Sequence, residues 1–270
     1  MDLQLQGKRA LVTGSTAGIS WAIARELATE GVAVVVNGRD RARTARAIKR
    51  LCAAVPGAQV DAVQADVGTA DGCAHLAEAA GDVDILVDHC GIFDPRPFEQ
   101  IDDAKWQHFV EVNVMSGVRL SRALLPAMKA RNWGRIVFIS SESGICPPAE
   151  MVHSGMTKSA QLSVSRGLAE TCAGSGVTVN AVLPPDAYRG RRRVLRPAGK
   201  GCRPNTGRSR ERLLHPSATD LAAQALHRTA GSGGDGGLCL QPARQRHQRS
   251  GFAGRRWRGA HADLNLSLQL

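Results

Sequence analysis

The chain has 270 residues, a formal net charge of +11, and seven cysteines scattered without a Cys-x-x-Cys pair. This length suits one large domain or two small ones, and the cysteine pattern favours reduced thiols over a disulfide framework or a zinc site. The first thirty residues lack a secretory signal and no apolar run is long enough to span a bilayer, so we expect a cytoplasmic protein without a metal or a membrane partner.

The positive charge is concentrated in one part of the chain. Residues 186–270 carry 17 Lys and Arg against 5 Asp and Glu, whereas residues 1–185 have a net charge of −1. Sixteen of those 17 basic residues are arginines, which fall without any period among Gly, Pro, Gln and Ser. Proteins that bind phosphate backbones usually mix in lysine and gather the charge on one face of an element. We therefore expect no nucleic-acid partner, and an RNA-associated protein is the least favoured class.

From the amino end to residue 185, two patterns alternate. Short apolar runs predict strands at Arg9–Thr13, Val32–Asn37, Val60–Gln64, Ile85–Val87, Arg135–Ser140 and Val177–Val182. The stretches between them predict helices at Ile19–Glu30, Arg41–Ala54, Gly72–Ala80, Asp103–Arg131 and Ser154–Ala173. This alternation predicts an α/β fold, a Rossmann-type doubly wound parallel sheet in a single domain, with its ligand at the carboxyl ends of the strands where the strand order reverses.

After Pro184 this order stops. No convincing strand follows, apolar periodicity is lost, and Gly and Arg dominate. We therefore divide the chain into a dinucleotide-binding domain at residues 1–185 and an irregular Arg/Gly-rich tail at residues 186–270.

A glycine-rich turn connects the first predicted strand to the first predicted helix. Its residues run Thr13-Gly14-Ser15-Thr16-Ala17-Gly18-Ile19-Ser20. Backbone N–H groups at such a helix start can cradle a pyrophosphate, and glycines allow it to approach. The same turn also serves as an ordinary connection in other folds, but the strand before it, the helix after it and the next strand favour nucleotide binding.

Four further motifs follow in order: Asp66-Val67, Asn113, Ile139-Ser140-Ser141 and Ser154-x-x-x-Lys158. Together with the glycine turn they resemble the short-chain dehydrogenase/reductase family from residue 7 to about residue 184. The resemblance implies an oxidoreductase that interconverts a small carbonyl compound and an alcohol by hydride transfer, as a homo-dimer or tetramer. Carried over by position, its cofactor-binding residues are Gly14, Ser15, Thr16, Gly18, Ile19, Asp66, Val67, Gly91 and Lys158.

The resemblance also implies a catalytic set of Ser141, Ser154, Lys158 and Asn113. In the family a tyrosine, here Ser154, exchanges a proton with the substrate oxygen, and Lys158 would lower its pKa and hold the nicotinamide ribose. Ser141 would hydrogen-bond the substrate oxygen, although a strand-end serine is also often satisfied locally. Asn113 would help to hold a water-linked proton relay. An aliphatic hydroxyl is shorter and a far weaker acid than a phenol, so we expect impaired turnover, the alternative being a non-catalytic nucleotide-binding relic.

The end of the second strand bears on the choice of cofactor. Val36-Asn37-Gly38-Arg39 has no acidic residue to bond a ribose 2′-hydroxyl, whereas Arg39 is able to pair with a 2′-phosphate. This favours NADP over NAD, unless Arg39 is merely a solvated residue ahead of an arginine-rich helix. Asp66 resembles the family residue that bonds the adenine amino group, and a helix N-cap is its structural alternative.

Three positions depart from the family. Ser20 replaces the third glycine of the turn, where a side chain is expected to crowd the helix against the strand. Asp88-His89-Cys90-Gly91 stands where Asn-Asn-Ala-Gly is usual, and a charged Asp88 there needs a partner or costs stability. Pro184-Pro185 replaces the usual Pro-Gly.

The sequence of the tail suggests a shift of reading frame in the gene. When Leu226–Arg258 is assigned permitted codons and read one base later, one consistent choice gives a sequence that ends in N-G-x-x-L-x-V-D-G-G, as this family does. Shifted reading of GC-rich codons also explains the arginine excess. We therefore favour a frame-shifted tail over a disordered basic one.

Overall fold

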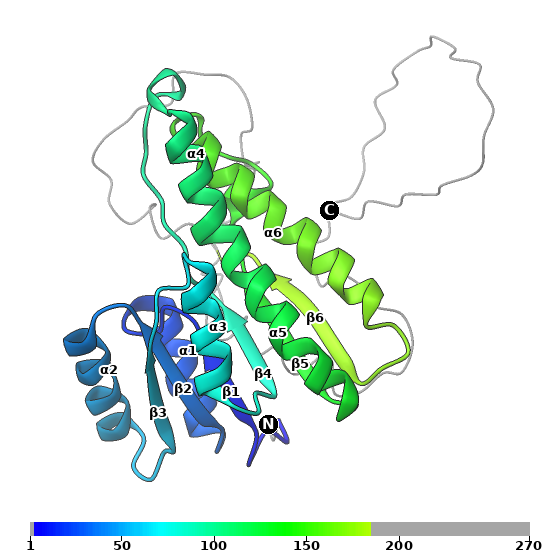
Figure 1. The fold of residues 1–270 in the computed structure, drawn as a ribbon. Coiled ribbons are helices and arrows are strands. Elements are labelled where there is room, and N and C mark those ends of the chain that lie inside the picture. The colour runs from blue at the N-terminus through cyan, green and yellow to red at the C-terminus, as the bar shows by residue number, and fades with distance from the viewer. Residues whose placement is uncertain (1–2, 185–270) are drawn as a thin grey trace, which may run out of the picture.

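The computed structural model describes residues 3–184, which form one six-stranded parallel sheet in the order β3-β2-β1-β4-β5-β6 (Figure 1). The strands are β1 (Arg9–Val12), β2 (Ala33–Gly38), β3 (Val60–Gln64), β4 (Ile85–Asp88), β5 (Gly134–Ile139) and β6 (Val177–Val182). The predicted Rossmann-type sheet is confirmed, and the six predicted strands agree with the structure to within a residue at each end.

Alternate residues of the central strands enter two different cores. Along β1, Ala10 and Val12 join one buried cluster and Leu11 joins the other, because successive side chains of a strand point to opposite faces. Ala10 pairs with Val34 on β2 and with Ile85 on β4, so β1 lies between these two strands. A parallel sheet buried on both faces explains why these strands are apolar throughout.

Helices cover both faces of the sheet (Figure 1). On one face lie α1 (Gly18–Thr29) and α2 (Arg41–Ala54), and on the other lie α3 (Ala70–Ala80), α5 (Ser116–Ala130) and α6 (Val152–Thr171). A shorter helix, α4 (Asp103–Val110), leads into α5. Single 3₁₀ turns occur at η1 (Phe98–Gln100), η3 (Glu142–Gly144) and η4 (Ala149–Met151).

The helix expected at Asp103–Arg131 is not uniform. Between α4 and α5 the backbone forms a π-helical turn, η2 (Glu111–Met115), with Asn113 at its centre. Periodicity alone does not reveal such a turn, because the residues on either side of it still read as helical. A π-turn leaves a main-chain carbonyl without its usual helical partner, and such turns often occur at functional sites.

The strand order reverses between β1 and β4, so the loops after these two strands diverge and open the crevice in which doubly wound folds bind ligands. The expectations for residues 186–270, including the frame shift and the missing seventh strand, lie outside the described residues, as does Pro185. Between residues 3 and 184, no helix combines the length and the apolar character needed to cross a membrane.

Candidate active site

The glycine turn after β1 presents open main-chain N–H groups. Gly14 and Gly18 have φ angles of +59° and +63°, which favour glycine. The N-cap of α1, Ala17, supplies no side-chain hydrogen bond, so the first-turn N–H groups lack the usual cap. A Cβ added at Gly18 would meet nothing within 4 Å in the described part of the chain. This uncapped helix start facing open space can accept an anion.

Asn37, at the end of β2, holds the glycine turn in place. Its side chain is 1% exposed; Oδ1 accepts a 3.2 Å hydrogen bond from Gly14 N, and Nδ2 donates to the carbonyls of Val63 and Ala65 at 3.2 Å each. Its main-chain N–H donates to Ser15 Oγ at 3.0 Å. The amide is therefore satisfied within the protein, and it ties three strand ends together.

The other predicted residues of the turn lie at its edges. The Ser15 hydroxyl is fully buried and donates to the Val12 carbonyl at 2.7 Å, and its main-chain N–H donates to the Asn37 carbonyl at 2.9 Å, so Ser15 shapes the turn and both donors are used within it. Thr16 lies over the end of β2, where a Cβ on Gly38 would overlap its side chain. Ile19 packs at the edge of the core on the α1 face. These residues therefore shape the turn, but not every one of them presents its side chain to the open side where a ligand would bind.

Ser20 was expected to crowd the glycine turn, and in the structure it does not. Its hydroxyl donates to the carbonyls of Gly14 at 2.8 Å and Ala17 at 3.2 Å, and the residue is 1% exposed. The side chain therefore closes the turn by a hydrogen bond instead of pushing α1 away from β1.

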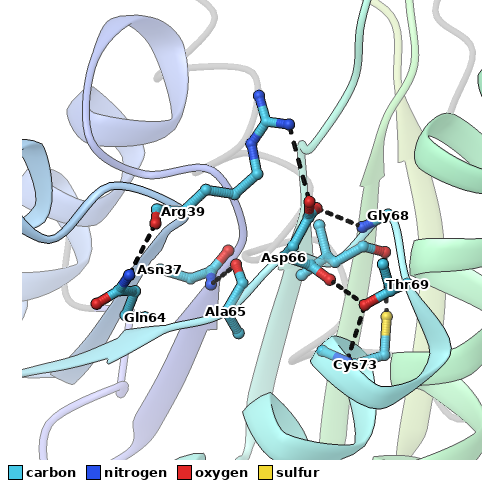
Figure 2. Close-up of polar contacts among 10 residues, drawn as sticks. Asn37, Arg39, Gln64, Ala65, Asp66, Gly68, Thr69 and Cys73 are labelled. Carbon is cyan, nitrogen blue, oxygen red and sulfur yellow. Dashed lines mark hydrogen bonds and ion pairs between the residues drawn. The ribbon is translucent and has the colours of Figure 1, made fainter.

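Arg39 extends from the end of β2 toward Asp66, as Figure 2 shows. Arg39 Nη1 lies 3.9 Å from Asp66 Oδ2, and both side chains are well exposed. Asp66 Oδ1 accepts a 3.0 Å hydrogen bond from Gly68 N, and the Arg39 carbonyl accepts one of 3.0 Å from Gln64 Nε2. The guanidinium and the carboxylate thus flank the ends of β2 and β3.

Val67 and Thr69 continue this segment into α3. Val67 is 2% exposed, and its carbonyl accepts a hydrogen bond from the Cys73 thiol at 3.2 Å. Thr69, and not Asp66, is the N-cap of α3, since its hydroxyl accepts a 3.0 Å hydrogen bond from Gly72 N. Asp66 is therefore not used as the cap, and one of its oxygens faces Arg39.

Across the crevice, Lys158, Gly91 and Asn113 come together from α6, the loop after β4 and η2. A Cβ added at Gly91 would lie 3.4 Å from Asn113 Oδ1 and 3.6 Å from Lys158 Nζ. Lys158 Nζ donates to the Ile139 carbonyl at 3.0 Å. Burial lowers the pKa of Lys158, and the negative charge of Asp88 opposes this shift. The ammonium is thus held at the carboxyl end of β5.

Ser141 and Ser154 occupy the remaining predicted catalytic positions. Ser141 Oγ accepts hydrogen bonds from the main-chain N–H of Ser143 at 3.2 Å and from its hydroxyl at 3.0 Å, so it caps η3. Ser154 is 3% exposed on α6, one helical turn before Lys158, and its hydroxyl makes no hydrogen bond within residues 3–184. The second serine therefore contributes no acidic group and no fixed hydroxyl.

Two histidines lie near these residues. Burial lowers the pKa of His89 to about 4, with a further contribution from the positive charge of Lys158. His153 is fully buried, packs its ring 4.1 Å from that of Phe109, and also has a pKa lowered by burial. The lowered pKa values disfavour the imidazolium form of both rings, so neither is suited to act as a general acid at neutral pH.

Asp88 ends β4 beneath this crevice and is fully buried. Burial raises its pKa to about 7, while the positive charge of Lys158 and a hydrogen bond from Thr13 oppose the shift. Thr13 itself accepts hydrogen bonds from His89 N and Cys90 N at 2.9 Å each. The family-atypical segment after β4 is therefore anchored to the start of the glycine turn.

The structure brings the predicted residues into two groups at one edge of the sheet. The glycine turn, Arg39 and Asp66 form the first, and Asn113, Gly91 and Lys158 form the second; Ser141 and Ser154 lie on η3 and α6 beside it. Sequence reasoning missed the supporting residues Asn37, Thr13 and Gln161. A polar residue closing an apolar strand was a signal for Asn37, whereas no pattern in the sequence distinguishes Gln161.

The parallel sheet, the open glycine turn at its switch point and the buried lysine define a nucleotide-binding α/β oxidoreductase fold. The family model for short chain dehydrogenases matches residues 8–189. The chain belongs to the short-chain dehydrogenase/reductase family, a family of oxidoreductases that bind a nicotinamide cofactor.

Curated relatives and solved structures agree with this assignment. An uncharacterized oxidoreductase of Bacillus subtilis, YvaG, is 49% identical over 68% of this chain and 70% of that protein. A D-beta-hydroxybutyrate dehydrogenase of Cupriavidus necator is 34% identical over 67% of this chain and 70% of its own length. The structure of L-sorbose reductase from Gluconobacter frateurii, complexed with NADPH and L-sorbose, gives a TM-score of 0.66 at 34% identity, covering 68% of this chain and 71% of that one.

Proposed function

We propose that this chain is an NADP-dependent oxidoreductase that interconverts a small carbonyl compound and an alcohol, with turnover weakened by Ser154. The observation that carries the proposal is the position of Lys158, whose ammonium lies beside Gly91 and Asn113 at the carboxyl end of the sheet. A buried lysine at the ligand-binding edge of a doubly wound sheet is positioned to hold a bound group rather than to pair with solvent.

The residues present fit a dinucleotide. The uncapped start of α1 and the positive φ angles of Gly14 and Gly18 suit a pyrophosphate, with Ser15, Thr16 and Ile19 contributing through the turn. Asp66 and Val67 would border the adenine, and Gly91 and Lys158 the nicotinamide ribose. Gly91 lies beside both residues, since a Cβ added there would come within 3.4 Å of Asn113 Oδ1 and 3.6 Å of Lys158 Nζ.

NADP is proposed over NAD because of the end of β2. Arg39 is exposed and its guanidinium is able to form two parallel hydrogen bonds with a 2′-phosphate. The buried Asn37 amide is fully used by main-chain groups, so it does not compete for the ribose. In support, L-sorbose reductase and a 3-oxoacyl reductase from Agrobacterium tumefaciens were solved with NADPH and NADP respectively.

The bound cofactor supplies or accepts the hydride. The protein's own groups orient the reactants and manage the proton on the substrate oxygen. Ser141 Oγ would turn from its local partner Ser143 toward that oxygen, and the ammonium of Lys158 would favour negative charge nearby. Ser154 lacks a phenol, so the proton must be exchanged without the acid that Lys158 would activate. Loss of a general acid typically costs about 10²–10⁴-fold in rate.

The test combines binding with turnover. Titration calorimetry of the full chain with NADPH and NADH should show tighter binding of NADPH, and equal or weaker NADPH affinity would refute the cofactor assignment. The unaltered chain should oxidise NADPH slowly with a panel of ketones and aldehydes, and the Lys158→Met variant should not oxidise it at all. Robust activity in the unaltered chain would show that another group supplies the proton.

A second candidate is a nucleotide-binding protein without turnover. The observation in its favour is Ser154 itself: the residue is 3% exposed and offers only an aliphatic hydroxyl, which makes no hydrogen bond within the described residues. Tight NADPH binding with no oxidation of cofactor by any substrate of the panel would favour it. A cytoplasmic location and a homo-dimeric or tetrameric state stay predictions, and sedimentation of the purified chain tests the latter.

A further inference from the structure

Gln161 connects two parts of the candidate active site. The residue lies on α6, one turn after Lys158, and is 1% exposed. Its Oε1 accepts a 3.1 Å hydrogen bond from Lys158 Nζ, and its Nε2 donates a 2.7 Å hydrogen bond to the Asn113 carbonyl. A single amide therefore spans the distance between the lysine and the π-turn.

The Asn113 carbonyl is a rigid acceptor. It belongs to η2, where the change from α- to π-helical bonding alters the partners of the main-chain carbonyls. The Asn113 side chain is fixed as well, because Oδ1 accepts from Ile92 N at 2.7 Å and Nδ2 donates to the Ile92 carbonyl and to Thr157 Oγ1 at 3.0 Å each. The side chain of Asn113 is thus fixed by Ile92 and Thr157, and a group that bonds to the Asn113 carbonyl is fixed with it.

Lys158 needs such an anchor. An ammonium on a flexible four-carbon stem adopts many positions unless acceptors fix it. Two acceptors do so here, the Ile139 carbonyl at 3.0 Å and Gln161 Oε1 at 3.1 Å. Within residues 3–184, one of the three ammonium protons remains for a bound group. Neither contact involves Ser154, so the position of the ammonium does not depend on the residue at that site.

We propose that Gln161 is a positioning residue that fixes the Lys158 ammonium against the Asn113 carbonyl, and thereby organises the ribose-binding side of the site in advance of the cofactor. The inference rests on the proposed function for its purpose, but the geometry itself involves only residues of this chain. A purely structural role, in which Gln161 merely satisfies a buried carbonyl, is the competing explanation.

The two explanations differ in what happens to Lys158. Gln161→Met keeps the length of the side chain but removes both hydrogen bonds, and Gln161→Glu places a carboxylate beside the ammonium. The chain has six lysines, so labelling with [ε-¹³C]lysine gives six signals, and Lys158→Arg identifies one of them. Titration by NMR then reports the pKa of Lys158 without any cofactor or activity.

We expect Gln161→Met to lower the pKa of Lys158 by roughly one unit, because the charged form loses an acceptor, and Gln161→Glu to raise it. The matched control, Gln107→Met, changes an exposed glutamine of α4 and should leave that pKa unaltered. An unaltered Lys158 pKa in both folded Gln161 variants would overturn the proposal. If Gln161→Met does not fold, Gln161→Leu takes its place, because it also removes the acceptor without adding a charge.

Calorimetry with NADPH separates this inference from the proposed function. Gln161→Met should weaken NADPH binding about tenfold, a loss comparable to one charge-assisted hydrogen bond, while Gln107→Met should not. If the unaltered chain binds no NADPH but the Lys158 pKa shifts as expected, the proposed function fails and the positioning role stands. If NADPH binds equally to both Gln161 variants and to the unaltered chain, the positioning role fails alone.

Discussion

The Thr13 hydroxyl donates a 3.1 Å hydrogen bond to Asp88 Oδ1, and this contact joins the start of the glycine turn to the end of β4. The other carboxyl oxygen, Oδ2, is buried and has no hydrogen-bond partner within the described residues. A Cβ added at Gly117 on α5 would overlap it. A carboxyl group enclosed in this way favours its neutral form, and folding of the chain is therefore linked to pH.

Asp88→Asn should stabilise the protein at alkaline pH. Burial raises the Asp88 pKa from 3.8 to about 7, so the folded state binds more protons than the unfolded state between these values. The free energy of unfolding consequently falls as pH rises from about 4 to about 7 and levels off above. The free energy of unfolding of the variant, relative to that of the unaltered chain, should be larger at pH 8 than at pH 4 by on the order of 3 kcal/mol.

Urea unfolding at pH 4, 6 and 8 measures this effect. Asp103→Asn, which alters an exposed residue in the first turn of α4, serves as the control and should show no comparable pH-dependent gain. The same gain for Asp88→Asn at all three pH values would contradict the pKa shift.

Arg39→Ala should reduce the preference for NADPH. We expect about a 10–100-fold loss of NADPH affinity, because a charge-assisted pair contributes roughly 1.5–3 kcal/mol, and little change for NADH. Arg46→Ala, an exposed arginine of α2, controls for the general positive potential. Titration calorimetry with both cofactors gives the answer, and a parallel loss for NADPH and NADH would speak against a 2′-phosphate contact.

Asn37→Ala should destabilise the fold and loosen the glycine turn. The change leaves Gly14 N and the carbonyls of Val63 and Ala65 without their partner, which should cost about 1–3 kcal/mol. Gln64→Ala, which removes only an exposed hydrogen bond to the Arg39 carbonyl, should cost less than about 1 kcal/mol. Thermal unfolding compares the two, and equal losses would show that Asn37 is not the clamp described above.

Ser154→Tyr alone should recover little reductase activity. The phenol would regain an acid that Lys158 can activate, but Asp88 and the segment that begins at Pro185 would still differ from the family. The tyrosine combined with the restored reading frame should recover considerably more. The measurement is NADPH oxidation by the unaltered chain and the two variants against one panel of carbonyl compounds. Full recovery by the single substitution would show that the other departures are harmless.

Much of the fold is predictable from the sequence because it rests on local patterns. The strand of Val60–Gln64 and the helix of Arg41–Ala54 were expected with the bounds that the structure shows. Apolar runs that alternate with amphipathic stretches suffice to specify a parallel sheet and its covering helices. The positions of Gly14, Gly18 and Lys158 near the carboxyl edge follow from the same alternation.

The supporting contacts are harder to predict because they join residues far apart in the chain. Asn37 reaches Gly14, and Gln161 reaches Asn113, only after the sheet and α6 have packed. The effect of Ser20 on the glycine turn is also hard to predict from the sequence. Its hydroxyl donates a hydrogen bond to the Gly14 carbonyl, and this contact offsets the crowding that the added side chain would cause. Hydrogen-bond partners of buried polar groups are decided by tertiary structure.

The π-turn at Glu111–Met115 sets a constraint on insertions and deletions. Such a turn holds one residue more than the α-helix that would replace it, and each residue of an α-helix turns by about 100°. Deleting one residue of the turn would therefore restore regular helix and leave Leu120, Leu124 and Met128 against the sheet. Deleting a residue from the regular helix of α4 would instead rotate α5 by about 100° and turn those side chains away from the sheet. A change of one residue in length is therefore compatible with the packing of α5 only at the π-turn itself.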